Sequence, residues 1–166
     1  MPLTPATEAD LAEVSRQLGR PVRNVVAVAA RCVCGKPVAV QTEPRLDDGT
    51  PFPTVYYLTH RAATASMSRL EAGQLMVELQ DRLAVEPELA AAYQAAHEAY
   101  LEDRAKLGDV AEIAGISAGG MPTRVKCLHA LGAHALAAGP GVNPIGDIAL
   151  ARADWSPQVC ACNVDD

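Results

Sequence analysis

Aromatic residues are scarce in this sequence, whose 166 residues include only Phe52, Trp155 and four tyrosines. A hydrophobic core must therefore be built mainly from Ala, Val and Leu. The 49% of hydrophobic residues is still the apolar fraction of a globular protein, which excludes wholesale disorder. At this length we expect a single domain, because domains cluster near roughly 100–150 residues.

Long apolar runs and an excess of basic residues are also missing. No run approaches the roughly 18 apolar residues of a membrane span, and the N-terminus lacks the basic and apolar regions of a secretory signal. We therefore expect a cytoplasmic protein with reduced thiols and no membrane association. The net charge of −6 argues against binding to nucleic acid through phosphate contacts, so we expect no such partner.

The first sixty residues carry the signals of one helix and a small sheet. Thr7 and Asp10 form a capping pattern before an apolar stripe that Gly19 ends, which predicts a helix. Three short runs separated by turn residues predict strands: 24–30, 37–41 and 54–59. The turn at 32–36 is short enough for the first two strands to pair as a hairpin.

From Arg61 onward the hydrophobic period is that of helices. The pattern predicts a helix with a break at Gly73, helices over 87–107 and 123–138, and one from Asn143 to about Arg152. Strands early and helices late predict an α+β fold, with a small antiparallel sheet of about three strands packed by about four to five helices. We expect residues 1–152 to form this domain and residues 153–166 to be a mobile tail.

Four residues with metal-binding side chains lie at the ends of predicted elements: Cys32, Cys34, His60 and Cys127. Zinc takes about four N or S ligands, and iron–sulfur clusters take thiolates with His in some classes. The set therefore predicts a site for zinc or an iron–sulfur cluster. The alternative is that the thiols are small buried hydrophobes and that His60 caps a helix.

Helix geometry limits which residues can share that metal. Cys127 and His129 are two residues apart, about 200° around a helix axis, so we expect only one of them to reach the ion. Cys160 and Cys162 repeat the Cys-x-Cys spacing in the predicted tail, where we expect the pair to be incidental.

A glycine-rich stretch before the predicted helix 123–138 has the parts of an anion site. Glycines let backbone N–H groups converge, and a helix N-terminus is the positive end of its dipole. The candidate anion-binding residues are Ser117, Gly119, Gly120, Arg124, Lys126 and Arg31. His129 is the candidate general acid and base. The alternative is a glycine turn with solvated cations.

Several motifs together resemble one known family: Arg31-Cys32, Asp48–Thr54, Ser117–Pro122, Arg124–His129 and Gly141–Asp147. They are similar to the domain-of-unknown-function family 501, which is mainly actinobacterial and has no assigned activity. Its members often carry Cys at the position of His60, an exchange that a metal ligand tolerates. The position of Cys34 is often not Cys, which implies that His129, water or a substrate atom could complete an open, catalytic-type site. Family genes tend to lie near one for a septum-formation initiator.

Two functional hypotheses follow. The first is a cytosolic metal-binding protein with an adjacent anion-binding loop, which acts as an enzyme on a small anionic metabolite while His129 transfers protons. The alternative is a non-enzymatic adaptor or regulatory protein of cell division, with a protein partner and a structural metal or none. Four protein ligands would favour a structural metal, and three ligands with an open position would favour catalysis.

Overall fold

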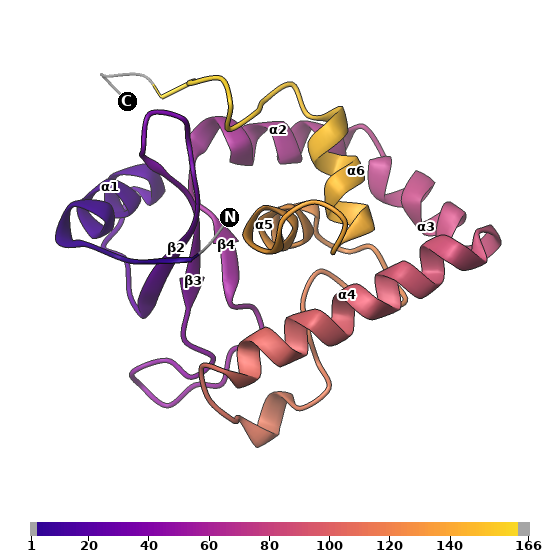
Figure 1. Cartoon of the computed structure of the whole chain (residues 1–166), viewed down its shortest axis with the longest axis horizontal. Helices are drawn as coiled ribbons and strands as arrows, with labels where there is room; N and C mark the ends of the chain where they lie inside the picture. Colours follow the sequence, from indigo (N-terminus) through magenta and orange to yellow (C-terminus); the bar gives the residue numbers. More distant parts are fainter. Residues whose placement is uncertain (1–2, 163–166) are drawn as a thin grey trace.

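A four-stranded antiparallel sheet and six α-helices make up the computed structural model, which describes residues 3–162 (Figure 1). The predicted α+β class is confirmed, with one strand and one helix more than expected. In chain order the elements are β1 Thr4–Pro5, α1 Glu8–Leu18, β2 Val25–Arg31, β3 Pro37–Thr42, β4 Tyr56–Leu58, α2 Arg61–Ala72, α3 Leu75–Val85, α4 Pro87–Ala105, the short 3₁₀ helix η1 Ala111–Ile113, α5 Leu128–Ala138 and α6 Pro144–Arg152.

The strands follow one another across the sheet in the order β1-β2-β3-β4, each antiparallel to its neighbour. Val40 lies at the centre of this register, opposite Val28 on β2 and Tyr57 on β4. The strand β1 was not predicted, because two residues that include a proline show no alternating pattern. It pairs with β2 through Thr4 opposite Val28.

Helix α5 is the centre of the core. In Figure 1 the sheet separates α1 on one side from α5 on the other, and α2, α4 and α6 surround α5. Leu128 and Leu131 are fully buried, and the whole sequence of α5 is apolar apart from two histidines. A helix that is hydrophobic on all sides is a buried one.

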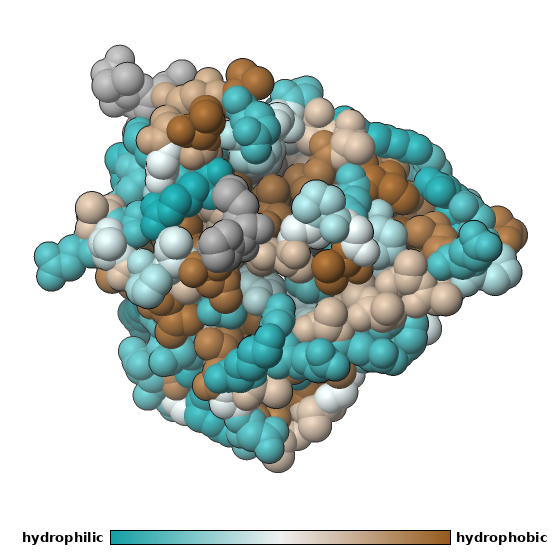
Figure 2. All heavy atoms as spheres, in the orientation of Figure 1, coloured by the Kyte–Doolittle hydropathy of each residue, from teal (hydrophilic) through white to brown (hydrophobic). Residues whose placement is uncertain are grey.

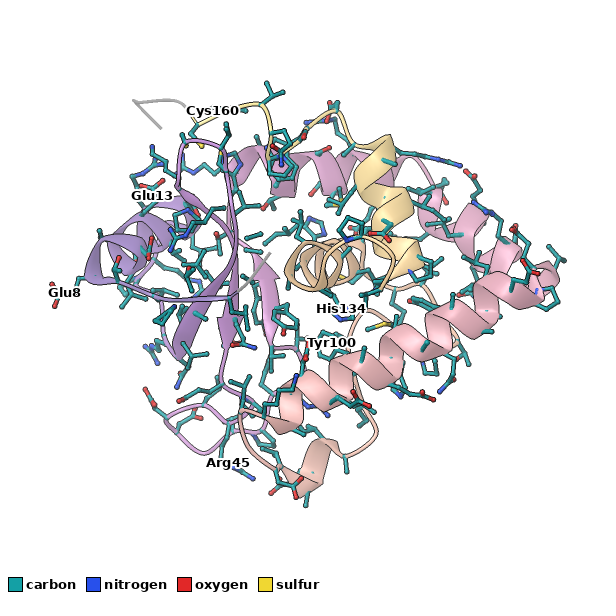
Figure 3. All side chains as sticks on the ribbon, viewed as in Figure 1. Glu8, Glu13, Arg45, Tyr100, His134 and Cys160 are labelled. Atoms are coloured by element: carbon teal, nitrogen blue, oxygen red, sulfur yellow. The ribbon has the colours of Figure 1, made fainter. Side chains whose placement is uncertain are left out.

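One of those histidines, His134, is part of this core. Its Nδ1 lies 3.1 Å from the Asn143 side chain, and its ring stacks on Tyr56 and meets the edge of Tyr100. Figure 3 shows Tyr100 and His134 facing each other between α4 and α5. Burial lowers the pKa of His134 to about 4, so the ring is neutral in the native protein.

Local signals set several helix boundaries as predicted. Thr7 and Asp10 form a reciprocal capping box, in which each side chain accepts the other residue's backbone N–H. Gly19 ends α1 in the left-handed conformation, with φ of 70°. Pro87 and Asn143 begin α4 and α6 as expected.

The helix predicted from residue 123 begins later, at Leu128. Residues 118–127 fold instead into turns, in which the Arg124 N–H donates to the Gly120 carbonyl and the Lys126 N–H to the Gly119 carbonyl. Gly120 has φ of +95°, and a Cβ there would lie 2.6 Å from the Arg124 carbonyl oxygen. The glycines therefore permit a tight turn at the place where we expected the helix to start.

The segment after α6 packs against the domain. Trp155 is buried and its ring lies 5.6 Å from that of His60. The Val33 N–H donates to the Pro157 carbonyl at 2.8 Å, and Cys162 packs against the core. Contacts thus extend to residue 162, while residues 163–166 of the predicted tail lie outside the described residues. The tail's mobility and the boundary at residue 152 remain predictions.

The surface is mixed in character. Figure 2 shows hydrophilic and hydrophobic residues interspersed over the face that it presents. Over residues 3–162, no helix combines the length and the apolar composition that a membrane span needs.

Candidate metal centre

Four cysteine sulfurs meet where the β2–β3 turn faces the segment after α6. The sulfurs of Cys32, Cys34, Cys160 and Cys162, here named the four-cysteine group, lie within 4.8 Å of one another. The Cys34 and Cys162 sulfurs are 3.6 Å apart, although 128 residues separate them in the sequence. In Figure 3 Cys160 is found beside the β2–β3 hairpin. Cys32 is buried, Cys34 and Cys160 are exposed, and Cys162 is half-buried.

A tight turn presents the first two sulfurs. The Cys32 N–H donates to the Lys36 carbonyl at 2.9 Å, and the Gly35 N–H donates to the Cys32 carbonyl at 2.8 Å. Gly35 has φ of +94°, a conformation that favours glycine. The hydrogen bond from Val33 to Pro157 fixes the chain that carries Cys160 and Cys162 against this turn.

His60 lies beside the four-cysteine group. It is the N-cap of α2, where its Nδ1 accepts the Ala63 N–H at 3.4 Å. Its other nitrogen, Nε2, is 3.0 Å from the Cys162 sulfur. Because Nδ1 acts as an acceptor, Nε2 carries the proton and donates to the sulfur. Burial lowers the pKa of His60, which favours this neutral form.

The thiols of the group differ in how readily they ionise. A hydrogen bond from the Lys36 backbone N–H lowers the pKa of Cys34 to about 7. Burial raises the pKa of Cys32 and of Cys162. In the absence of a cation, the exposed Cys34 thiol is therefore the one that ionises before these two.

A cavity of about 250 Å³ opens beside the group. His60 and Cys162 are among the residues that line it, together with Arg16 and Arg61. The Arg61 side chain donates to the last carbonyls of α1, which fixes its position. The cavity gives a path from solvent to the Cys162 side of the group.

The structure does not bring Cys127 together with Cys32, contrary to our prediction. His60 lies at the start of α2. Cys127 lies near Glu71, which is in the last turn of the same helix. Eleven residues separate these two positions on α2, which corresponds to about 16 Å along the axis. The length of α2 therefore keeps Cys127 away from the four-cysteine group. Cys160 and Cys162, which we expected to be incidental, supply the remaining sulfurs.

Cys127 forms a second group with His129 and Glu71, named here the Glu71–Cys127–His129 group, whose ligand atoms lie within 4.8 Å of one another. Our prediction that Cys127 and His129 could not easily share an ion assumed that both residues lie inside a helix, and the structure does not have that geometry. Cys127 is the extended N-cap of α5, with φ of −152° and ψ of 106°. Its side chain turns back and accepts the Ala130 N–H at 3.5 Å.

The charges of this second group are coupled. His129 Nδ1 is 3.1 Å from a Glu71 carboxylate oxygen. A hydrogen bond with Cys127, aided by the Glu71 charge, raises the pKa of His129 to about 9. The same hydrogen bond lowers the pKa of Cys127. In the metal-free group, this hydrogen bond therefore favours the imidazolium form of His129.

Two of the predicted anion-binding residues, Ser117 and Arg31, have other partners. Ser117 is buried, with its hydroxyl 2.7 Å from His97 Nδ1. Arg31 forms a two-pronged ion pair with Asp10 on α1. Arg124 and Lys126 are exposed, next to the turns that Gly119 and Gly120 make. Anion binding by this glycine-rich loop therefore remains a prediction, and Arg31 is paired with Asp10 instead.

Sequence reasoning missed three residues of these groups: Cys160, Cys162 and Glu71. The repeated Cys-x-Cys spacing was a usable signal, since two such pairs offer the four thiolates of a closed tetrahedral site. Glu71 had no comparable signal, because one acidic residue on an amphipathic helix is ordinary.

A comparison with protein families identifies the chain. Residues 28–151, most of its length, match the model of the family described as "Protein of unknown function (DUF501)". The chain belongs to this family. No curated protein and no solved structure matches it. The family match contains Cys32, Cys34 and the whole Glu71–Cys127–His129 group, and it ends before Cys160 and Cys162.

Proposed function

We propose that this DUF501 protein binds one zinc ion through the four-cysteine group, and that the ion fastens the segment after α6 to the β2–β3 turn. The observation that carries the proposal is the meeting of four sulfurs from two distant parts of the chain. Cysteine is the preferred ligand for structural zinc, which takes four ligands in a tetrahedron.

The spacing of the sulfurs favours a single ion over an iron–sulfur cluster. At a zinc–sulfur distance of about 2.3 Å, the edge of a tetrahedron of sulfurs is about 3.8 Å. The Cys34 and Cys162 sulfurs are 3.6 Å apart, and none of the four is more than 4.8 Å from another. A cluster of several irons spreads its thiolates over different metal atoms, which places them farther apart.

His60 supports the site from outside it. Its Nε2–H points at the Cys162 sulfur, and such a donor stabilises negative charge on a metal-bound thiolate. The residue that we predicted to be a ligand thus acts as a hydrogen-bond donor to one. The cavity beside His60 gives the ion a path to the sulfurs.

A closed set of four thiolates favours a structural ion, because no coordination position is left for a substrate. The zinc would stabilise the fold by linking two segments that only a few contacts otherwise join. This favours the non-enzymatic hypothesis for this site. A role in cell division and an anionic substrate both remain predictions.

Metal analysis of the full chain tests the proposal. We expect protein purified without oxygen to contain zinc, and we expect Cys34→Ser and Cys162→Ser to hold one ion fewer per chain. The control is Val33→Ala, an exposed substitution in the same turn that removes no sulfur and should leave the zinc in place.

Two results would contradict the proposal. A brown, iron-containing protein would indicate a cluster in place of zinc. Protein without metal whose four thiols all react freely, at undiminished stability, would mean that the sulfurs are neighbours without a shared ligand.

A further inference from the structure

Three different ligand types gather where the last turn of α2 meets the start of α5. They are the Glu71 carboxylate, the Cys127 sulfur and a His129 ring nitrogen, all within 4.8 Å of one another. This mixture of O, S and N donors is one that zinc accepts. The group is distinct from the four-cysteine group, because α2 separates them.

The distances are close to those of a coordinated ion. With ligands at about 2.0–2.3 Å, the edges of a zinc tetrahedron are roughly 3.3–3.6 Å. The Glu71 oxygen and His129 Nδ1 are already 3.1 Å apart. A contraction of at most about 1.5 Å in any remaining distance would bring the set to that geometry.

The surroundings orient His129 as a ligand. Its Nε2 lies 3.2 Å from the Thr64 carbonyl oxygen and 3.2 Å from the Ser68 hydroxyl. A carbonyl can only accept a hydrogen bond, so Nε2 carries a hydrogen and Nδ1 is the nitrogen that can bind a cation. Metal-bound histidines usually hold their second nitrogen in this way.

The other two donors are also held in place. Cys127 caps α5, where the Ala130 N–H and the positive end of the helix dipole favour negative charge on its sulfur. One Glu71 oxygen accepts the Leu128 N–H at 2.8 Å, and a carboxylate has further lone pairs for an ion. The His129 and Glu71 side chains are 28% and 24% exposed, so a cation can reach them from solvent.

We infer that Glu71, Cys127 and His129 form a second zinc site, with three protein ligands and one open position. An ion bound there takes the place of the proton between His129 and Glu71. Three protein ligands with a position left for water or substrate are typical of catalytic zinc. This site is independent of the proposed structural zinc and would give the protein a reactive centre of its own.

Zinc titration of the full-length, metal-stripped chain tests the inference. We expect the wild type to bind two zinc ions per chain, and Cys127→Ser, His129→Gln and Cys34→Ser to bind one each. Serine is among the best N-cap residues, so Cys127→Ser should keep α5 and leave the unfolding of the metal-free protein unchanged. Cobalt(II) titration adds a spectroscopic readout, because only sulfur-bound cobalt gives the thiolate charge-transfer band.

A finer variant tests the orientation of His129. Ser68→Ala removes one neighbour of Nε2 and should weaken zinc binding at this site roughly 10-fold, at unchanged stoichiometry. Unchanged affinity in this variant would contradict a role of the Ser68 hydroxyl in orienting the His129 ring.

The two zinc proposals fail in different ways. If the wild type binds one ion that only Cys34→Ser removes, the second site is wrong and the structural zinc stands. If the wild type binds one ion that only Cys127→Ser removes, the structural zinc is wrong and the second site stands. Fast alkylation of Cys127 at saturating zinc would also overturn the second site, because a zinc-bound thiolate is protected.

Discussion

The two ends of α2 carry two different kinds of candidate site. At its start, His60 borders four sulfurs that come from a β-turn and from the segment after α6. At its end, Glu71 joins a sulfur and an imidazole at the start of α5. The first set is closed and uniform, which suits a structural ion, and the second is open and mixed, which suits a reactive one. The residues of α2 that border the two candidate sites, His60 and Glu71, are thus eleven positions apart, which corresponds to about 16 Å along the helix axis.

Zinc removal should separate these sites by their effect on stability. We expect Cys34→Ser to lower the free energy of unfolding of the zinc-loaded protein by about 4 kcal/mol, the value for an ion held at a thousand times its Kd. Cys127→Ser should cost less, because we expect a site with three protein ligands to hold its ion more weakly than one with four, and the stabilisation follows the ratio of ion concentration to Kd. Urea unfolding with and without a chelator measures the free energy of unfolding of both variants. An equal decrease in the two variants would contradict the difference between a structural and a reactive site.

The segment after α6 should report the same difference. In Cys34→Ser we expect protease to cut between residues 153 and 162 faster than in the wild type, since one of its attachments is lost. Limited proteolysis with mass spectrometry locates the cuts. The same cleavage rate in wild type and variant would mean that the Val33–Pro157 hydrogen bond and Trp155 suffice to hold the segment.

A buried histidine outside both groups provides the reference for acid sensitivity. The pKa of His134 is about 4 in the fold against an ordinary 6.5, so the unfolded chain binds its proton first as the pH falls. Stability from His134 is complete above pH 6.5 and decreases by about 3 kcal/mol toward pH 4. We expect His134→Phe, measured without metal, to flatten this slope. Parallel pH profiles for wild type and variant would contradict a neutral buried ring.

The contact between His60 and Cys162 should have the smallest effect. His60→Asn keeps an N-cap for α2, since Asn is a good cap, but removes the ring's donor to the sulfur. We expect zinc affinity at the four-cysteine group to decrease roughly 10-fold, or about 1.4 kcal/mol, as for other donors to metal ligands. Competition with a chelator measures it. Unchanged affinity would mean that His60 acts only as the N-cap of α2.

Local signals explain which parts of the fold could be predicted from the sequence. Several helix boundaries are set by residues that lie within one helical turn of each other. They are the capping box of Thr7 and Asp10, the proline that begins α4 and the asparagine that caps α6. The strands β2 and β3 could be predicted because turn residues bound each of these short apolar runs. Each of these features depends on residues a few positions apart.

The candidate sites depend on contacts that such signals do not contain. Cys160 and Cys162 join Cys32 because the segment after α6 crosses back to the β2–β3 turn, a path that its composition did not indicate. Helix α5 begins later than predicted because of the turns at Gly119 and Gly120. Cys127 is therefore the N-cap of α5 and not a residue of the helix interior, as the sequence had suggested. This position of Cys127 explains why its sulfur lies close to the His129 ring.

X-ray absorption at the zinc edge of the Cys127→Ser protein shows which atoms surround the proposed structural ion, because this variant keeps only the four-cysteine group. We expect one zinc ion surrounded by four sulfurs at about 2.3 Å. A first shell that contains nitrogen or oxygen, or a protein that holds iron in place of zinc, would contradict it.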